Sequence, residues 1–244
     1  MSVRVNYFQM FRKSFELYKK NPIVLLPYII LNCMYFVIQV LPQYGYELFF
    51  WALLPVFVVF SILVGCGLLG MFYEATRKRT DMNTFWKTIR KRALSYVGAS
   101  ILLSLVVVGG FILIIIMGVV LGMVSSLVAL LFIILGFVYI FLSLFFLSFY
   151  MYGVVVDKKS AAESLALSYR IVRKNVWEVL KFYLFILLLS LFLISPPLII
   201  LAIISVFFKN LTQWLLAIFM IYSTLISPLF SFFTMLFYLR IRST

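Results

Sequence analysis

The sequence contains no histidine, only two cysteines and only seven acidic residues. Cys33 and Cys66 both fall inside apolar segments, where a cysteine usually acts as a small buried hydrophobic residue. We therefore expect no disulfide, no metal site and no cofactor. The acidic residues flank the long apolar runs, and none falls near the middle of one. Coupled carriers usually need an ionisable group within the membrane, so the pattern argues against coupled transport, and no residue set indicates catalysis.

Charged residues are scarce as well, at 11% of the chain, whereas a soluble domain has ~25%. Hydrophobic residues make up 66% and the mean hydropathy is +1.18. A backbone that crosses hydrocarbon must be helical or form a closed barrel, and the apolar runs here are continuous rather than alternating. The sequence therefore predicts an all-α integral membrane protein.

Six apolar runs reach the length needed to cross a bilayer, which is about 20 residues. They comprise residues 22–41, 48–73, 93–122, 127–156, 176–207 and 211–239. Pro196 and Pro197 fall within the fifth run. We expect a kink there rather than a break, because each half alone would be too short to span.

Basic residues are distributed very unevenly among the connections. Of the 21 lysines and arginines, 19 precede the first run, lie between runs two and three or four and five, or close the chain; Lys181 follows close behind in the first turns of the fifth run, and only Lys209 falls on the other side. Since connections rich in lysine and arginine stay in the cytoplasm, we expect both termini there and short external connections at 42–47, 123–126 and 209–210. The chain has no recognisable nucleic-acid-binding module, so membrane lipids with anionic headgroups are the expected partners.

An amphipathic stretch precedes each pair of runs. Residues 14–22, SFELYKKNP, return as residues 168–176, SYRIVRKNV, and more weakly as residues 86–93, WKTIRKRA, within the second amphipathic stretch, 82–93. Ser160 and Glu163 form a predicted capping box at the start of the third stretch, and Asp81 or Asn83 is the expected N-cap of the second. This pattern favours one membrane domain, 1–244, of three helical hairpins, each preceded by an amphipathic interfacial helix. The corresponding repeats would be 1–75, 80–156 and 157–244, with a shared membrane-surface composition as the alternative explanation.

These stretches suggest a site for lipid headgroups, because long cationic side chains and aromatic rings both settle at headgroup depth. The alternatives are that the charges serve topology alone, or that the three helices control a cytoplasmic opening. The headgroup-binding candidates are Lys19, Lys20, Arg90, Lys91, Arg173, Lys174 and Trp177.

Polar residues within the runs form a second set of candidates. Asn32 and Gln39 lie two helical turns apart on one face of the first run, and hydroxyl groups recur along the sixth. They either line a cavity or form hydrogen bonds between helices. The cavity-lining candidates are Asn32, Gln39, Ser223, Thr224, Ser227 and Ser231.

Small residues within the runs predict close helix packing. Residues 65–70, GCGLLG, match a dinucleotide-binding fingerprint, but that motif needs a strand before it and a solvent-facing helix after it. Inside an apolar run the glycines indicate close contact between helices, as do the pairs Gly118 with Gly122 and Ser100 with Ser104.

Residues 156–159, VDKK, and 164–180, SLALSYRIVRKNVWEVL, resemble a known family. It comprises prokaryotic six-helix proteins grouped around the membrane domain of glycerophosphoryl diester phosphodiesterases, with related membrane families of unknown function. The resemblance implies an integral domain of a prokaryotic cell membrane. Hydrolysis in that family depends on histidines and metal-binding carboxylates of a separate soluble barrel, which this chain lacks, so the resemblance implies no activity here.

We therefore expect a multi-pass protein of the cytoplasmic membrane, without catalytic activity, that binds or organises lipids or other amphiphiles. One alternative is an uncoupled channel or the membrane subunit of a transporter or exporter. Another is an immunity or scaffold protein that binds a protein partner or forms a homo-oligomer.

Overall fold

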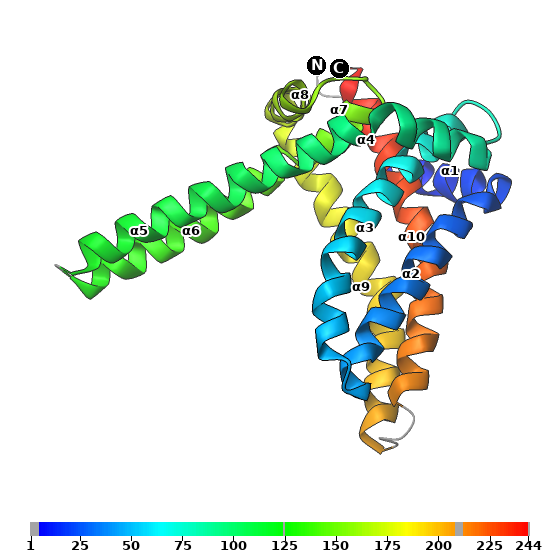
Figure 1. Ribbon diagram of the computed structural model, residues 1–244. Helices are drawn as coiled ribbons and strands as arrows, with labels where there is room; N and C mark the ends of the chain where they lie inside the picture. Colours follow the sequence, from blue (N-terminus) through cyan, green and yellow to red (C-terminus); the bar gives the residue numbers. More distant parts are fainter. Residues whose placement is uncertain (1–4, 124, 208–211, 244) are drawn as a thin grey trace. The chain divides into compact units, whose positions relative to one another are not determined.

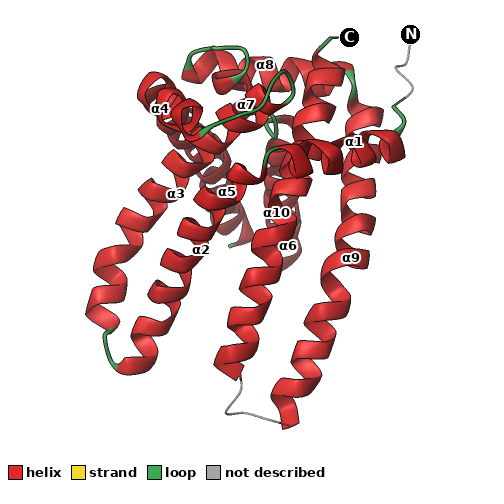
Figure 2. Ribbon diagram, turned by 90° about the vertical axis from the view of Figure 1, so that its right-hand side faces the viewer, coloured by secondary structure: helices red, strands yellow, loops and turns green. Residues whose placement is uncertain are grey.

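The computed structural model describes residues 5–123, 125–207 and 212–243. Every regular element within these ranges is helical (Figure 2), as the composition predicted. Six segments are long and apolar enough to cross a membrane: Pro22–Val40, Glu47–Ala75, Met82–Gly122, Ser126–Val155, Val176–Ile204 and Ala217–Arg242. The predictions that involve Arg4, Val124, Lys209, Asn210 and Leu211 fall outside the described residues.

The chain forms two compact units, one of Met1–Arg90 with Trp177–Thr244, the other of Lys91–Val176. The first unit contains α1 (Tyr7–Lys20), 3₁₀ turns at Pro22–Val24 and Leu41–Tyr44, α2 (Leu25–Val40), α3 (Glu47–Ala75), the start of α4 (Met82–Ser104), nearly all of α9 (Val176–Phe207) and α10 (Thr212–Arg242). The second contains the rest of α4, a π-helical turn at Leu105–Gly109, α5 (Gly110–Gly122), α6 (Ser126–Phe146), α7 (Tyr150–Val155) and α8 (Ala161–Lys174).

Aromatic side chains form the core of the first unit, in which α10 packs against α1, α2 and α3 (Figure 1). The rings of Phe182 in α9 and Phe237 in α10 stack with their centroids 3.8 Å apart. Phe72 in α3 meets Phe232 in α10 edge to face at 4.6 Å, one of the two geometries that aromatic pairs favour. This core lies beside the ends of the helices that bear the basic residues, and it fixes the position of α1.

Helix α1 docks through some of its aromatic residues and through one small polar residue. Ser14 is completely buried, Phe11 packs edge to face on Phe233, and the Tyr7 hydroxyl donates to the Glu178 carbonyl and carboxylate at 3.1 and 3.2 Å. Phe8, in contrast, is 75% exposed. Ser14 is small and allows a close approach of α1 to its neighbours, while Phe8 remains outside this contact.

The second amphipathic stretch is not a separate helix, and the prediction of an interfacial helix before the third run is wrong in this respect. Helix α4 begins at Met82 and continues without a break to Ser104, because residues 82–93 contain neither proline nor glycine that would end it. Asp81 caps its start, accepting from the Thr84 N–H at 2.8 Å. The Thr84 N–H and, with a smaller effect, the Thr84 hydroxyl donate to the Asp81 carboxylate, and these two hydrogen bonds lower the pKa of Asp81.

Glycines bring helices together where the small-residue pattern predicted it. A Cβ on Gly67 or Gly70 in α3 would overlap the side chain of Phe85 or Thr88 in α4. In the second unit α5 and α6 lie side by side (Figure 1), and a Cβ on Gly118 would come within 2.6 Å of Phe132. The helix-packing interpretation of these glycines is therefore confirmed. Helix α9 is continuous through Pro196 and Pro197, which agrees with the expectation that the two prolines do not break the fifth run.

The fourth run is interrupted, which the sequence did not predict. Helix α6 ends at Phe146 and α7 begins at Tyr150. The buried hydroxyl of Ser168 in α8 donates to the Phe146 carbonyl and accepts from the Phe149 N–H, both at 3.0 Å. One side chain thus forms hydrogen bonds with two backbone groups on either side of the break. The predicted capping box of Ser160 with Glu163 is confirmed at the start of α8.

Candidate functional site

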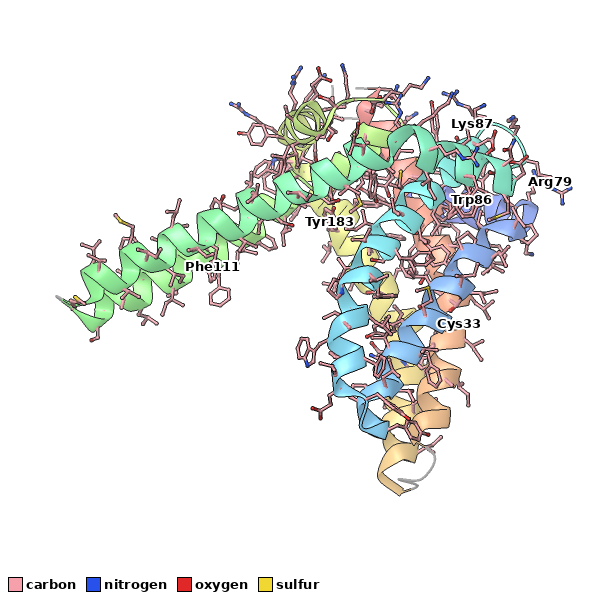
Figure 3. The ribbon with its side chains drawn as sticks, in the orientation of Figure 1. Cys33, Arg79, Trp86, Lys87, Phe111 and Tyr183 are labelled. Atoms are coloured by element: carbon pink, nitrogen blue, oxygen red, sulfur yellow. The ribbon has the colours of Figure 1, made fainter. Side chains whose placement is uncertain are left out.

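A basic pocket of about 620 Å³ lies between the end of α1 and the loop from α3 to α4. Two lysines come from α1, and two arginines and a lysine come from the loop, where Arg79 lies beside α1 (Figure 3). The lining residues are Leu17, Lys19, Lys20, Asn21, Ala75, Thr76, Arg77, Lys78 and Arg79. Five cations therefore converge from two segments that are more than 50 residues apart in the sequence.

A buried asparagine holds the two segments together. Asn21 caps the end of α1, where its Nδ2 donates to the Leu17 carbonyl at 2.9 Å. Its Oδ1 accepts from the Thr80 N–H at 2.9 Å. Asn21 is 2% exposed and Thr80 5%, so this bond between α1 and the loop is shielded from competing water. The position of the loop cations relative to the α1 lysines thus depends on one amide side chain.

Glu74 at the end of α3 holds the same loop from the other side. Its Oε2 accepts from the Thr80 hydroxyl at 3.1 Å and also from the Thr84 hydroxyl. Its Oε1 lies 3.0 Å from the Lys78 Nζ. The Thr80 side chain of the loop, the start of α4 and one of the five cations are therefore tied to a single carboxylate.

The five cations differ in how tightly they are held. Besides Lys78, the Arg77 guanidinium lies 4.4 Å from the centre of the Tyr73 ring and donates to its hydroxyl, and the Lys19 Nζ lies 4.6 Å from the centre of the Phe15 ring. Lys20 and Arg79 are exposed and form no ion pair or hydrogen bond with the described part of the chain. These two side chains have unused hydrogen-bond donors, Lys20 on the α1 side of the pocket and Arg79 on the loop side.

The electrostatics of the pocket follow from helix ends as well as side chains. Five cations with the Glu74 carboxylate give a net charge of +4. The pocket adjoins the C-terminal ends of α1 and α3, whose dipoles favour cations. No helix N-terminus contributes to its lining. An anion would therefore be held by ammonium and guanidinium groups, and Arg79 could offer a phosphate two parallel hydrogen bonds.

The structure places only some of the predicted headgroup residues in this pocket. Lys19 and Lys20 line it, whereas Arg90 and Trp177 belong to the same unit but not to the pocket lining. Lys91, Arg173 and Lys174 belong to the second unit. Arg77, Lys78 and Arg79 are among the expected cytoplasmic cations between runs two and three, but the sequence does not associate them with α1. Their proximity to the α1 lysines depends on the long-range bond of Asn21, for which the sequence has no local signal.

The first and third amphipathic helices end in the same way. Asn175 caps α8 and, like Asn21, donates its Nδ2 to the carbonyl four residues earlier, at 3.1 Å. Ser14 and Ser168, at equivalent positions of the sequence pattern, are 0% and 1% exposed. The similarity in sequence thus extends to the cap and to the buried face of the helix.

Among the predicted cavity-lining residues, Asn32 and Thr224 meet between α2 and α10. The Asn32 Nδ2 donates to the Thr224 Oγ1 at 2.6 Å, and the Thr224 hydroxyl donates to the Met220 carbonyl at 2.6 Å. An apolar groove of about 550 Å³ adjoins this pair, and the exposed Cys33 lies within it (Figure 3). The groove is lined by Ile29, Asn32, Cys33, Phe36, Val37, Ala217, Met220, Ile221, Thr224 and Leu225.

The other four candidates lie outside this lining. Ser231 shares a 2.7 Å hydrogen bond with Tyr28, a second polar contact between α10 and α2. Gln39 is exposed and donates to the Tyr35 hydroxyl of its own helix at 2.5 Å. The hydroxyls of Ser223 and Ser227 donate to carbonyls of their own helix at 2.9 and 2.7 Å. Of these four residues, Ser231 alone forms a hydrogen bond between helices, as the alternative interpretation predicted, whereas Gln39, Ser223 and Ser227 bond within their own helices.

The fold and the two concave sites define an all-helical protein with six helices of membrane-spanning length. Within its described residues, no group of three or more histidine, cysteine, aspartate or glutamate residues could hold a metal ion. A family model described as "Domain of unknown function (DUF7847)" matches residues 6–241, and the chain therefore belongs to this family. Searches of curated proteins and of solved structures gave no match.

Proposed function

We propose that this protein is a multi-pass protein of the cytoplasmic membrane that binds anionic phospholipid headgroups in the basic pocket and performs no catalysis. One observation carries this proposal. The pocket has a net charge of +4 and is assembled from distant segments by a buried hydrogen bond between Asn21 and Thr80. Scattered topological charges do not require such a bond, whereas a binding site benefits from cations that are held in place before the ligand arrives.

The exposure of apolar side chains supports a location in the membrane. In α5 and α6, Leu113, Leu131 and Phe137 are 65%, 52% and 63% exposed. A contiguous apolar surface of this kind is not stable in water. With the cations on the cytoplasmic side, six crossings place both termini in the cytoplasm, and α2 with α3 and α5 with α6 form two of the three proposed hairpins. The basic pocket then lies at the depth of the cytoplasmic headgroups.

The lack of catalytic residues supports a binding role rather than an enzymatic one. The chain has no histidine, and the Glu74 carboxylate is occupied by Lys78 and two threonines. The resemblance around residues 156–180 to membrane domains of glycerophosphoryl diester phosphodiesterases is compatible with this role, since it covers the membrane part and no hydrolytic centre.

Native mass spectrometry of the detergent-purified full chain, titrated with phosphatidylglycerol, tests the proposal. The double variant Lys20→Gln/Arg79→Gln removes the two unpaired cations of the pocket. The control Lys87→Gln/Lys159→Gln removes the same charge from two exposed positions outside the pocket lining. At about 1 kcal/mol for each of two hydrogen bonds lost to the headgroup, the pocket variant should weaken binding about 30-fold, whereas the control should change it little. Equal losses in the two variants would contradict a defined site.

The second candidate function is an uncoupled passage, which the groove beside Asn32 and Thr224 favours. The native cysteines test it, because Cys33 lies in the groove and Cys66 is completely buried. A water-filled path would let a membrane-impermeant maleimide label Cys33 in sealed vesicles, with Cys66 as the unlabelled reference. Labelling of Cys33 by a lipid-soluble maleimide alone would show that lipid fills the groove and would contradict a passage there.

A further inference from the structure

We infer that the basic pocket binds a ligand with two phosphate groups rather than one. This inference rests on the proposed function and specifies the class of headgroup. It starts from charge: one phosphodiester carries a single negative charge, whereas the pocket has a net charge of +4. A single phosphodiester would leave most of that charge uncompensated, and a second phosphate on the same ligand reduces the mutual repulsion of the cations further.

The arrangement of the cations supports two phosphate positions. Lys19 and Lys20 line the pocket from α1, and the arginines and Lys78 line it from the loop. Each side has one cation without a partner in the described part of the chain, Lys20 on α1 and Arg79 on the loop, beside others held by a ring or a carboxylate. Each side can therefore offer a phosphate one cation that has no partner in the described part of the chain and at least one that a ring or a carboxylate holds in place.

The size of the pocket agrees with this composition. Its volume of about 620 Å³ lies within the range of small-molecule sites, about 300–1,000 Å³. A lone phosphate has five heavy atoms and needs roughly 150 Å³ if each takes the ~30 Å³ share of a water molecule. The pocket is thus several times larger than one phosphate, and it has room for two phosphates and the linker that joins them.

Two sources could supply a ligand of this chemistry. One is a diphosphatidyl lipid headgroup, in which a glycerol joins two phosphodiesters. The other is a soluble diphosphate. Both present two phosphates within one small ligand, and basic pockets of membrane proteins on the cytoplasmic side bind lipid headgroups of the first kind.

The experiment compares cardiolipin with phosphatidylglycerol at equal phosphate concentration, by native mass spectrometry of the full chain in detergent. We expect cardiolipin to bind about tenfold more tightly per phosphate. The Lys20→Gln/Arg79→Gln variant should lose most of this preference, and the control Lys87→Gln/Lys159→Gln should keep it. Circular dichroism of each variant checks that the helical content is unchanged.

Soluble competitors separate the two sources. If inorganic diphosphate displaces cardiolipin and orthophosphate at equal phosphate does not, the two-phosphate chemistry is supported and a free diphosphate is the ligand. If neither displaces it while the cardiolipin preference persists, the lipid headgroup is the ligand. Equal affinity for the two lipids per phosphate would overturn the inference. After such a result, weaker phosphatidylglycerol binding by the pocket variant would still support the proposed function. If the pocket variant bound both lipids as tightly as the unmodified protein, the proposed function would be contradicted as well.

Discussion

Replacing Asn21 by alanine separates a built pocket from general electrostatic attraction, because it removes no charge. The side chain makes two hydrogen bonds, one that caps α1 at Leu17 and one that accepts from the buried Thr80 N–H. Without Asn21, the loop that bears Arg77 and Arg79 loses its link to α1. General attraction between cations and an anionic membrane would be unaffected by the substitution.

The size of the effect can be estimated from these two bonds. A buried donor left without an acceptor costs about 1–3 kcal/mol, and the lost cap bond adds about 1 kcal/mol. Local destabilisation of about 2–4 kcal/mol corresponds to an increase of roughly 30- to 1,000-fold in the open population of the loop. Hydrogen exchange of peptides that cover residues 76–84 measures this increase directly, and lipid titration of the same sample measures binding.

We expect Asn21→Ala to lose protection at the Thr80 amide and to weaken cardiolipin binding about tenfold or more. Asn175→Ala is the matched control, since Asn175 makes the equivalent cap bond at the end of α8 but does not line the pocket. Unchanged lipid affinity in Asn21→Ala, despite faster exchange at Thr80, would refute the reasoning that the loop must be held in place. Unchanged exchange would refute the structural role of the bond.

Three further predictions concern packing and the polar contacts between helices. Ser168→Ala removes the two hydrogen bonds that its hydroxyl makes to the backbone at the break between α6 and α7, so thermal unfolding in detergent should show a loss of about 2 kcal/mol; an unchanged midpoint would argue against the bridge. Gly70→Val forces a branched side chain against Thr88 and should cost about 1–3 kcal/mol in the same assay, and full stability would contradict the close approach of α3 and α4. Asn32→Leu should lower the stability by only ~0.6 kcal/mol, because the Thr224 hydroxyl keeps its hydrogen bond within α10. A large loss of solute flux through vesicles that contain this variant would instead favour the passage.

The six candidate spans could be predicted because apolar length is a local property of the sequence. The packing role of Gly67 and Gly70 could also be predicted, since a small residue in an apolar helix has few other uses. The capping box at Ser160 and Glu163 is likewise a short-range signal. In each case the information lies within a few residues of the feature.

The break between α6 and α7 could not be predicted, because residues 127–156 are apolar throughout and contain no proline. The hydroxyl that stabilises it comes from Ser168, 22 residues after Phe146. The docked face of α1 was missed for a related reason. Phe8 is a large aromatic residue yet is 75% exposed, whereas the small polar Ser14 is completely buried, and neither outcome follows from residue type alone.

Of the five cations that line the basic pocket, the sequence indicated two as members of a possible site. Lys19 and Lys20 could be proposed as headgroup ligands because they close an amphipathic helix beside an apolar run. From the sequence, the loop arginines could be assigned only to the cytoplasmic cations between runs two and three. The bond from Asn21 to Thr80 that joins the two sets spans 59 residues, and no pattern in a single sequence reveals such a pairing.

The central claim is that an anionic headgroup occupies the pocket between α1 and the loop from α3 to α4. Photo-crosslinking tests it most directly, with the full chain reconstituted in vesicles that contain an anionic phospholipid bearing a photoreactive headgroup. Mass spectrometry of the crosslinked peptides should place the lipid on residues 17–21 and 75–79. Crosslinks confined to other basic stretches, such as the end of α8, with none on these two segments, would contradict the account.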